Sequence, residues 1–258
     1  MTPAEGSACA RAALAGNPSD GYGGAVLAVT LNEQRAQTLA GPAAALQVSP
    51  DSELVRATVD RFARHLVPAA ARTAIAWSTS IPRAVGLGGS SAIVIAALRA
   101  LCSLHAVTLP RATLAELALA IEVEELGIAA GLQDRVAQAY GGLTFMDFGP
   151  AAGRHCYERL DPALLPPLLV AWRPEAAGES GAVHATLRTR FEQRDPVVRS
   201  GLTEFAKLAG RARAGGASAN NAGSGGAIVA ACTDAGQRER VSRQLREIGC
   251  RTLAPVPI

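Results

Sequence analysis

The pattern of hydrophobic and polar positions predicts strands and helices mixed along the chain. Short apolar runs bounded by turn-forming residues are typical of strands, and they occupy residues 9–16, 24–31, 72–79, 141–148, 166–172, 225–232 and 251–258. Apolar residues spaced three and four apart are typical of helices. They occupy residues 49–66, 90–104, 110–126, 132–139 and 234–248, with two further helices over 182–213 that break near Pro196. Strands and helices do not alternate regularly, so we expect an α+β fold.

A proline-rich stretch at residues 161–167 divides this pattern into two parts. Proline clusters commonly mark connections between packed elements, so we expect two domains, covering residues 1–165 and 166–258. A chain of 258 residues is long enough to bury a substantial core in either arrangement.

Composition narrows the environment and the partners. No apolar run reaches the ~18 residues of a membrane span, and the first residues lack the basic and apolar regions of a secretion signal. Five cysteines without a C-x-x-C pair favour a reducing, cytoplasmic location. The net charge of +3 is spread out without a basic tract, which disfavours nucleic acid as a partner.

Lysine usage excludes two kinds of phosphate site. Lys207 is the only lysine in the chain, whereas a P-loop nucleotidase needs a lysine in its glycine loop and a protein kinase needs one on a strand. If the glycine-rich loop described next holds phosphate, it must therefore do so with backbone N–H groups and a helix end.

The segment PRAVGLGGSSA, residues 82–92, is suited to that task. Gly86, Gly88 and Gly89 let the backbone approach a ligand, and a helix N-terminus offers unpaired N–H groups to an anion. A glycine-rich turn with serine caps is the alternative. A G-x-S-x-G nucleophile elbow is disfavoured, because Ala92 stands where its last glycine should be.

Three ordered segments resemble the motifs of the GHMP kinases, a family that includes galactokinase, homoserine kinase and mevalonate kinase. They are the glycine loop, RAALAGNPSDGYGG at residues 11–24, and AGSGGA at residues 222–227. The segments AAGLQDRVAQAYGGLTFMDF and SGAVHATLRTRF are most similar to the glucuronokinases of plants. The resemblance implies a two-domain fold with the active site in the interdomain cleft, and ATP and Mg²⁺ as cofactors. It implies a sugar kinase that converts D-glucuronate to D-glucuronate 1-phosphate.

The same resemblance implies roles for particular residues. The ATP-binding residues would be Pro82, Gly86, Leu87, Gly88, Gly89, Ser90, Ser91, Ala92, Gly223, Ser224 and Gly225. One of Ser90 and Ser91 would also reach Mg²⁺. Glu122 would be a metal ligand, because it precedes Asp134 by the twelve residues found between the corresponding groups of galactokinases.

Asp134 matches the catalytic aspartate of the family and would accept or orient the proton of the sugar hydroxyl. A helix-capping aspartate is the alternative. Arg11 would keep Asp134 ionised and neutralise the transferring phosphoryl group. Sugar-binding residues would be Asn17, Ser19, Asp20 and Asp134, with Arg135, Arg188 or Arg83 reading a uronate carboxylate. The turn at residues 17–20 could instead be purely structural.

Two departures from the family pattern support other readings. Asn220 and Ala222 stand where related kinases carry the lysine and threonine of K-x-T-G, and residues 211–219 alone separate EFAKLAG from the third motif. The C-terminal domain is therefore expected to be shortened. The alternatives are an impaired relative that binds nucleotide or sugar in a regulatory role, and a kinase for heptose phosphate, fucose or galactose. The oligomeric state is left open.

Overall fold

The computed structural model describes residues 3–17, 20, 23–149, 156–174, 212, 214–223 and 225–256. It divides into two compact units that interleave along the chain. Unit 1 comprises Met1–Ala10, Glu33–Ile81 and Gly88–Gly141, and unit 2 comprises Arg11–Asn32, Pro82–Leu87 and Gly142–Ile258. Mixed strands and helices occur in both units, which confirms the predicted α+β class. The division expected near residue 165 stays a prediction.

Two long strands, β1 (Ala4–Ala15) and β2 (Ala25–Pro42), contribute to both units. The sequence analysis predicted only residues 9–16 and 24–31. The second half of β2 was missed because its buried positions are Ala36, Thr38 and Ala40, which alternate with exposed residues but are small or weakly hydrophobic. Such residues give a weak period-two signal although they lie in the sheet.

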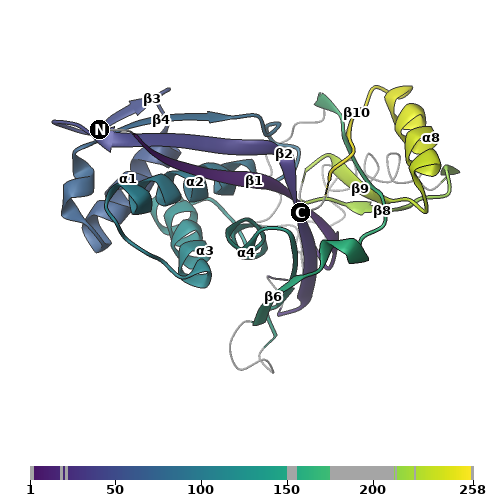
Figure 1. Ribbon diagram of the computed structural model, residues 1–258, viewed down its shortest axis with the longest axis horizontal. Coiled ribbons are helices and arrows are strands. Elements are labelled where there is room, and N and C mark those ends of the chain that lie inside the picture. Colours follow the sequence, from purple (N-terminus) through teal and green to yellow (C-terminus); the bar gives the residue numbers. More distant parts are fainter. Residues whose placement is uncertain are drawn as a thin grey trace, which may run out of the picture. The chain divides into compact units, whose positions relative to one another are not determined.

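In unit 1, β4 (Thr73–Thr79) pairs antiparallel with the second half of β2, and β3 (Gln47–Ser49) pairs parallel with β4. Four helices lie on one face of these strands (Figure 1). They are α1 (Glu53–His65), α2 (Gly89–Leu104), α3 (Arg111–Ala120) and α4 (Gln133–Tyr140), and a short turn η2 (Pro68–Ala71) follows α1. Helix α1 begins later than predicted, because Ser52 caps it by accepting a hydrogen bond from the Val55 N–H.

Helix α2 is the central helix of unit 1. Its apolar residues are buried on most sides, as expected of a helix without a polar face. Strand β1 crosses it closely, since a Cβ built on Gly6 would lie 2.1 Å from the Ala96 carbonyl oxygen. Helix α3 continues into a π-helical turn, η3 (Ile121–Glu125), within the predicted helix of residues 110–126.

In unit 2, the first half of β2 pairs antiparallel with β5 (Leu143–Asp147), which pairs with β6 (Cys156–Leu160). A second sheet has the order β10-β7-β9-β8 with antiparallel neighbours. Its strands are β10 (Arg251–Leu253), β7 (Leu168–Trp172), β9 (Ala227–Ala231) and β8 (Ser218–Asn221), and a short turn η5 (Pro162–Leu164) precedes β7. Strands β6 and β8 were not predicted, and β10 is shorter than expected.

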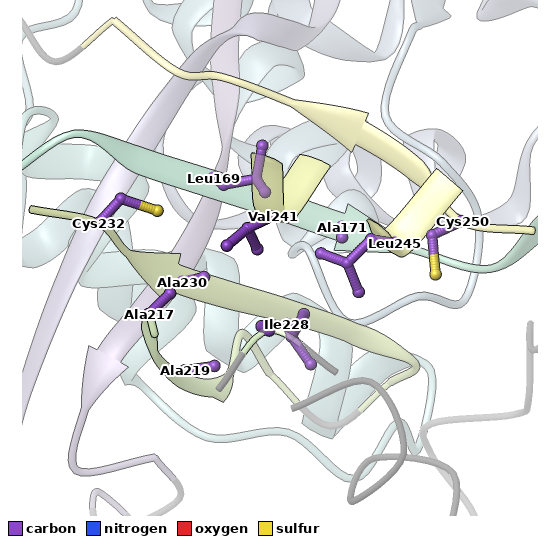
Figure 2. Close-up of a cluster of buried hydrophobic side chains, with 11 residues drawn as sticks. Leu169, Ala171, Ala217, Ala219, Ile228, Ala230, Cys232, Val241, Leu245 and Cys250 are labelled. Atoms are coloured by element: carbon purple, nitrogen blue, oxygen red, sulfur yellow. The ribbon is translucent and has the colours of Figure 1, made fainter. Parts of the chain in front are cut away.

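Helix α8 (Ala235–Arg246) packs on the second sheet and closes its core. Val241 and Leu245 of the helix meet Leu169 and Ile228 of the strands in one cluster of buried side chains (Figure 2). The helices predicted over residues 182–213 lie almost wholly outside the described residues. Among the helices that the structure describes, none is both long enough and apolar enough to span a membrane.

Candidate nucleotide and catalytic site

The backbone of the glycine loop alternates in handedness. Ala84, Gly86 and Gly88 have φ values of 56°, 81° and 71°, whereas Val85 and Leu87 do not have positive φ. Such alternation turns successive amide N–H groups toward one side and forms an anion-binding concavity. Alanine rarely adopts a positive φ, so strain is concentrated in the segment expected to bind phosphate.

Three successive carbonyl groups of this loop, those of residues 85–87, are engaged within unit 2. The carbonyl oxygen of Val85 accepts from the Ala227 N–H at 3.0 Å, and that of Leu87 accepts from the Arg11 N–H at 3.1 Å. The Gly86 carbonyl accepts from Arg11 Nη1 at 3.0 Å. Among the described residues, by contrast, no hydrogen bond has the amide nitrogen of Gly86 or Leu87 as its donor. Within residues 85–87 the carbonyls are therefore bonded inside the protein, whereas the N–H groups of Gly86 and Leu87 donate to no acceptor in the described part of the chain.

Gly88 connects this loop to helix α2 in unit 1. It is the N-cap, in the left-handed conformation, and no side chain caps the helix there. The Gly88 carbonyl accepts from Ser91 Oγ at 3.2 Å and from Gln138 Nε2 at 2.7 Å. The first amides of α2 consequently have no capping side chain, and an anion there would be stabilised by the helix dipole.

The two serines of the loop differ in exposure. Ser91 is 0% exposed, and its hydroxyl donates to the Gly88 carbonyl, whereas Ser90 is exposed. Gln138, which the sequence analysis did not single out, also donates to the Cys9 carbonyl at 3.1 Å. Its position four residues after Asp134, on the same face of α4, is the signal that could have found it.

Arg11 is 2% exposed in unit 2. Besides the Gly86 carbonyl, its Nη1 donates to the Ala222 carbonyl at 2.5 Å. Ala222 opens the third glycine-rich motif, in which Gly223 is buried, Gly225 is half-buried and Ser224 lies outside the described residues. Arg11 belongs to unit 2 and Asp134 to unit 1, so the catalytic role expected for Arg11 stays a prediction.

Glu122 and Arg135 form a buried ion pair in unit 1. Glu122 Oε2 accepts from Arg135 Nε at 2.7 Å and from Nη2 at 2.5 Å. Arg135 Nη1 donates to the Gly131 carbonyl at 2.8 Å. The side chains are 0% and 5% exposed, and within the described residues Glu122 Oε1 has no hydrogen-bond partner. A buried carboxylate oxygen without a donor is suited to a cation, which prefers hard oxygen ligands.

Asp134 lies in the first turn of α4, where the helix dipole favours a negative charge. The N-cap of this helix is Leu132, so Asp134 is not the capping residue. Its Oδ2 lies 3.8 Å from Arg135 Nη1, and its side chain is 18% exposed. Asp134 is thus the accessible carboxylate beside the buried pair.

The remaining predicted residues are only partly described. Asn17 and Asp20 are half-buried in unit 2, and Arg83 is exposed in the glycine loop. Ser19 and Arg188 lie outside the described residues. In the parts of the chain that the structure covers, no group of three or more His, Cys, Asp or Glu side chains could hold a metal. An ion bound chiefly by phosphate would need fewer protein ligands than that.

A hollow of about 350 Å³ in unit 1 is not part of this constellation. It lies over β2, β3 and β4, lined by small and apolar residues such as Leu39, Val48 and Ile75. It contains no charged side chain and none of the predicted site residues, so it offers no chemistry for phosphate.

Comparisons with known proteins agree with these motifs. Residues 53–142 match the family described as GHMP kinases N terminal domain. Glucuronokinase 1 of Arabidopsis thaliana is 41% identical over 149 residues, which are 55% of this chain and 41% of that protein. The chain therefore spans less than half the length of that relative.

Solved structures that align with nearly the full length of the chain share its fold. The D-glycero-D-manno-heptose 1-phosphate kinase from Bacteriodes thetaiotaomicron has a TM-score of 0.74 at 20% identity, covering 98% of this chain and 96% of that chain. Streptococcus pneumoniae phosphomevalonate kinase, in complex with phosphomevalonate and AMPPNP, has a TM-score of 0.74 at 15% identity, covering 98% and 99%. The resemblance expected from the sequence is confirmed: residues 53–142 match the GHMP kinases N terminal domain, and the fold is that of the GHMP kinases.

Proposed function

We propose that this protein is an ATP-dependent sugar kinase that phosphorylates the anomeric hydroxyl of its substrate. The observation that carries the proposal is the glycine loop, whose handedness alternates from Ala84 to Gly88 while the carbonyls of residues 85–87 are occupied. Amide groups directed to one side, followed by the open start of α2, favour the oxygens of a polyphosphate. The chain has a single lysine, Lys207, so a lysine-containing phosphate loop is excluded, which favours this backbone mode of binding.

Magnesium would be held by few protein groups. Glu122 Oε1 is a buried acceptor without a hydrogen-bond donor among the described residues, and the hydroxyl of exposed Ser90 is better placed than the engaged hydroxyl of Ser91. When bound, Mg²⁺ would neutralise charge on the phosphates of ATP. Arg135 would hold Glu122 through Oε2 and thereby leave Oε1 for the ion.

Asp134 would act on the sugar. Its carboxylate would accept the proton of the attacking hydroxyl while the oxygen of that hydroxyl forms its bond to the γ-phosphorus. The bond from that phosphorus to the bridging oxygen breaks, and ADP leaves. Phosphoryl transfer depends mainly on positioning and charge neutralisation, so these side chains need only orient the hydroxyl and take up its proton.

D-Glucuronate is the substrate that we favour, with D-glucuronate 1-phosphate as product. The name and 41% identity of the Arabidopsis relative support this choice. A uronate carboxylate requires a cation, and Arg135 is already engaged by Glu122 and Gly131. Arg83, exposed in the glycine loop, is the better placed of the described candidates, and Arg188 remains the other.

The test is ADP release by the purified full chain with Mg²⁺–ATP and one sugar at a time. D-Glucuronate, D-galacturonate, D-galactose, L-fucose and a heptose phosphate cover the alternatives. We expect turnover with D-glucuronate and a product phosphorylated at the anomeric carbon by ³¹P NMR. Turnover with heptose phosphate alone would reassign the substrate within the same chemistry. Binding of ATP without turnover of any sugar would favour the regulatory relative.

A further inference from the structure

The side chain of Arg11 joins two segments that are distant in sequence. One Nη1 group donates both to the Gly86 carbonyl, in the glycine loop, and to the Ala222 carbonyl, at the start of the third motif. The backbone of β1 adds to this link, since the Ala13 N–H donates to the Ala222 carbonyl at 2.9 Å. Arg11 therefore lies between the loop and residues 222, 223 and 225–227, which we term the support turn.

The glycines of the support turn are required by the glycine loop itself. A Cβ on Gly223 would lie 2.1 Å from the Gly86 carbonyl oxygen and 2.7 Å from Arg11 Nη1. A Cβ on Gly225 would lie 2.2 Å from the Val85 carbonyl carbon. The two glycine-rich segments consequently pack backbone against backbone, with no space for a side chain between them.

Arginine suits this position better than lysine. Its planar guanidinium presents several donors in a fixed geometry, whereas lysine is a flexible point charge. Arg11 is buried, so carbonyls that lose their charged donor would be left without an equivalent partner. At the third motif, where related kinases carry K-x-T-G, Asn220 donates to the Leu14 carbonyl at 3.3 Å and Ala222 receives Arg11.

We propose that Arg11 is a positioning residue, which holds the carbonyls of the glycine loop against the support turn so that the loop amides remain directed at the nucleotide. The identity of the ligand as a nucleotide rests on the proposed function. The contact that Arg11 makes between the loop and the support turn, which we term the clamp, does not. This role differs from the catalytic one expected from the sequence, because Arg11 would act through the loop and not on the reacting phosphoryl group.

The test compares Arg11→Lys with Arg99→Lys in the full chain. Arg99 is a matched control, since its guanidinium also donates to backbone carbonyls, of Ser7, Gln138 and Ala139, but in unit 1. Two measurements are made. Hydrogen exchange by NMR follows the amides of Ala13 and Ala227, which bond to the support turn and to the loop. Titration calorimetry and kinetics give the Kd of ATP and kcat at saturating ATP.

In Arg11→Lys we expect exchange at these two amides to accelerate about tenfold, ATP to bind about tenfold more weakly, and kcat at saturating ATP to change little. In Arg99→Lys, the Kd of ATP and kcat should equal those of the wild type. Exchange at the two amides should also be unchanged once it is corrected for any change in global stability. Unchanged exchange in Arg11→Lys would overturn the proposal. So would a fall in kcat with Kd and exchange unchanged, which would restore the catalytic role.

Two further arms separate the possible failures. If the wild type does not bind ATP but Arg11→Lys still accelerates exchange, the clamp is supported and the proposed kinase function fails. If Arg11→Lys does not fold, Gly225→Ala keeps Arg11 and displaces Val85 instead. It should weaken ATP binding and accelerate the same exchange, and an unaltered Kd and exchange rate in folded Gly225→Ala would overturn the proposal.

Discussion

Arg135 donates from both Nε and Nη2 to a single carboxylate oxygen, Oε2 of Glu122, inside unit 1. The geometry leaves the other oxygen of Glu122 without a partner in the described part of the chain. Arg135, one of the three arginines expected to read a substrate carboxylate, is thus engaged by a carboxylate of the protein. Removing one member of a buried pair leaves an uncompensated charge, which costs more than the pair contributes.

We therefore predict that Arg135→Met lowers the free energy of unfolding by about 3–5 kcal/mol. The matched control is Arg56→Met, which breaks the exposed pair between Arg56 and Asp51, with side chains 45% and 77% exposed. That change should cost less than about 1 kcal/mol. Urea unfolding followed by circular dichroism measures both. Equal losses in the two variants would contradict the importance assigned to the buried pair.

Asp134→Asn tests the base. Asparagine keeps the shape of the side chain but cannot accept a proton at neutral pH, so kcat should fall by about 10²–10⁴-fold. The Kd of ATP should stay close to that of the wild type, because the loss lies in the transition state. Steady-state kinetics and calorimetry give the two quantities.

The control for this change is Asp60→Asn, at an exposed position of α1 in the same unit. It should leave kcat and the melting temperature unaltered. Near-normal kcat in Asp134→Asn, with an intact fold by circular dichroism, would reject the catalytic assignment.

Gly6→Ala should destabilise unit 1. The added Cβ would lie 2.1 Å from the Ala96 carbonyl oxygen and 2.5 Å from the Ala100 nitrogen, both backbone atoms that cannot rotate away. Overpacking of this kind costs about 1–3 kcal/mol. Gly41→Ala is the paired control, since its Cβ would meet nothing within 4 Å. It should shift stability by less than about 1 kcal/mol. Thermal unfolding that ranks the two variants equally would show that β1 can move away from α2.

Asp234 should make α8 sensitive to acid. Hydrogen bonds from the Gln237 N–H and the Thr233 hydroxyl hold the pKa of this N-cap carboxyl below its ordinary value of 3.8. Because the pKa is lower in the folded state, the ionised carboxylate stabilises the fold at pH values above 3.8. This contribution is lost as the pH falls below 3.8 and through the pKa of the folded state. In Asp234→Asn, which still caps the helix, the fall in melting temperature between pH 6 and pH 3 should be smaller than in the wild type. An identical pH profile would show that the carboxylate contributes nothing.

The local elements around the candidate site could be predicted because their motifs are local. Gly86, Gly88 and Gly89, followed by two serines, predict a loop before a helix. The structure contains that loop, with Gly88 as the N-cap of α2. The fold class followed from strands and helices whose apolar periodicity is strong. The end of β2 and the strands β6 and β8 were not predicted, because their residues are exposed, polar or small and give little apolar periodicity. These segments are extended because they pair with neighbouring strands.

Pairings between distant residues could not be predicted in the same way. Glu122 and Arg135 are each charged residues in helical segments, and nothing in their spacing indicates that they meet. Likewise, the sequence shows Arg11 and the third motif but not the shared carbonyls of Gly86 and Ala222. These contacts depend on how strands and turns from different parts of the chain pack, which a motif does not encode.

The π-helical turn at Ile121–Glu125 has a consequence for chain length. A π turn closes hydrogen bonds one residue later than an α turn, and each residue of an α-helix advances about 100° around the axis. Deleting one residue here would restore an α turn and rotate Glu122 relative to the segment that carries Arg135. In an alignment of relatives, a one-residue gap inside this turn would therefore mark chains in which the carboxylate at the position of Glu122 no longer faces the residue at the position of Arg135.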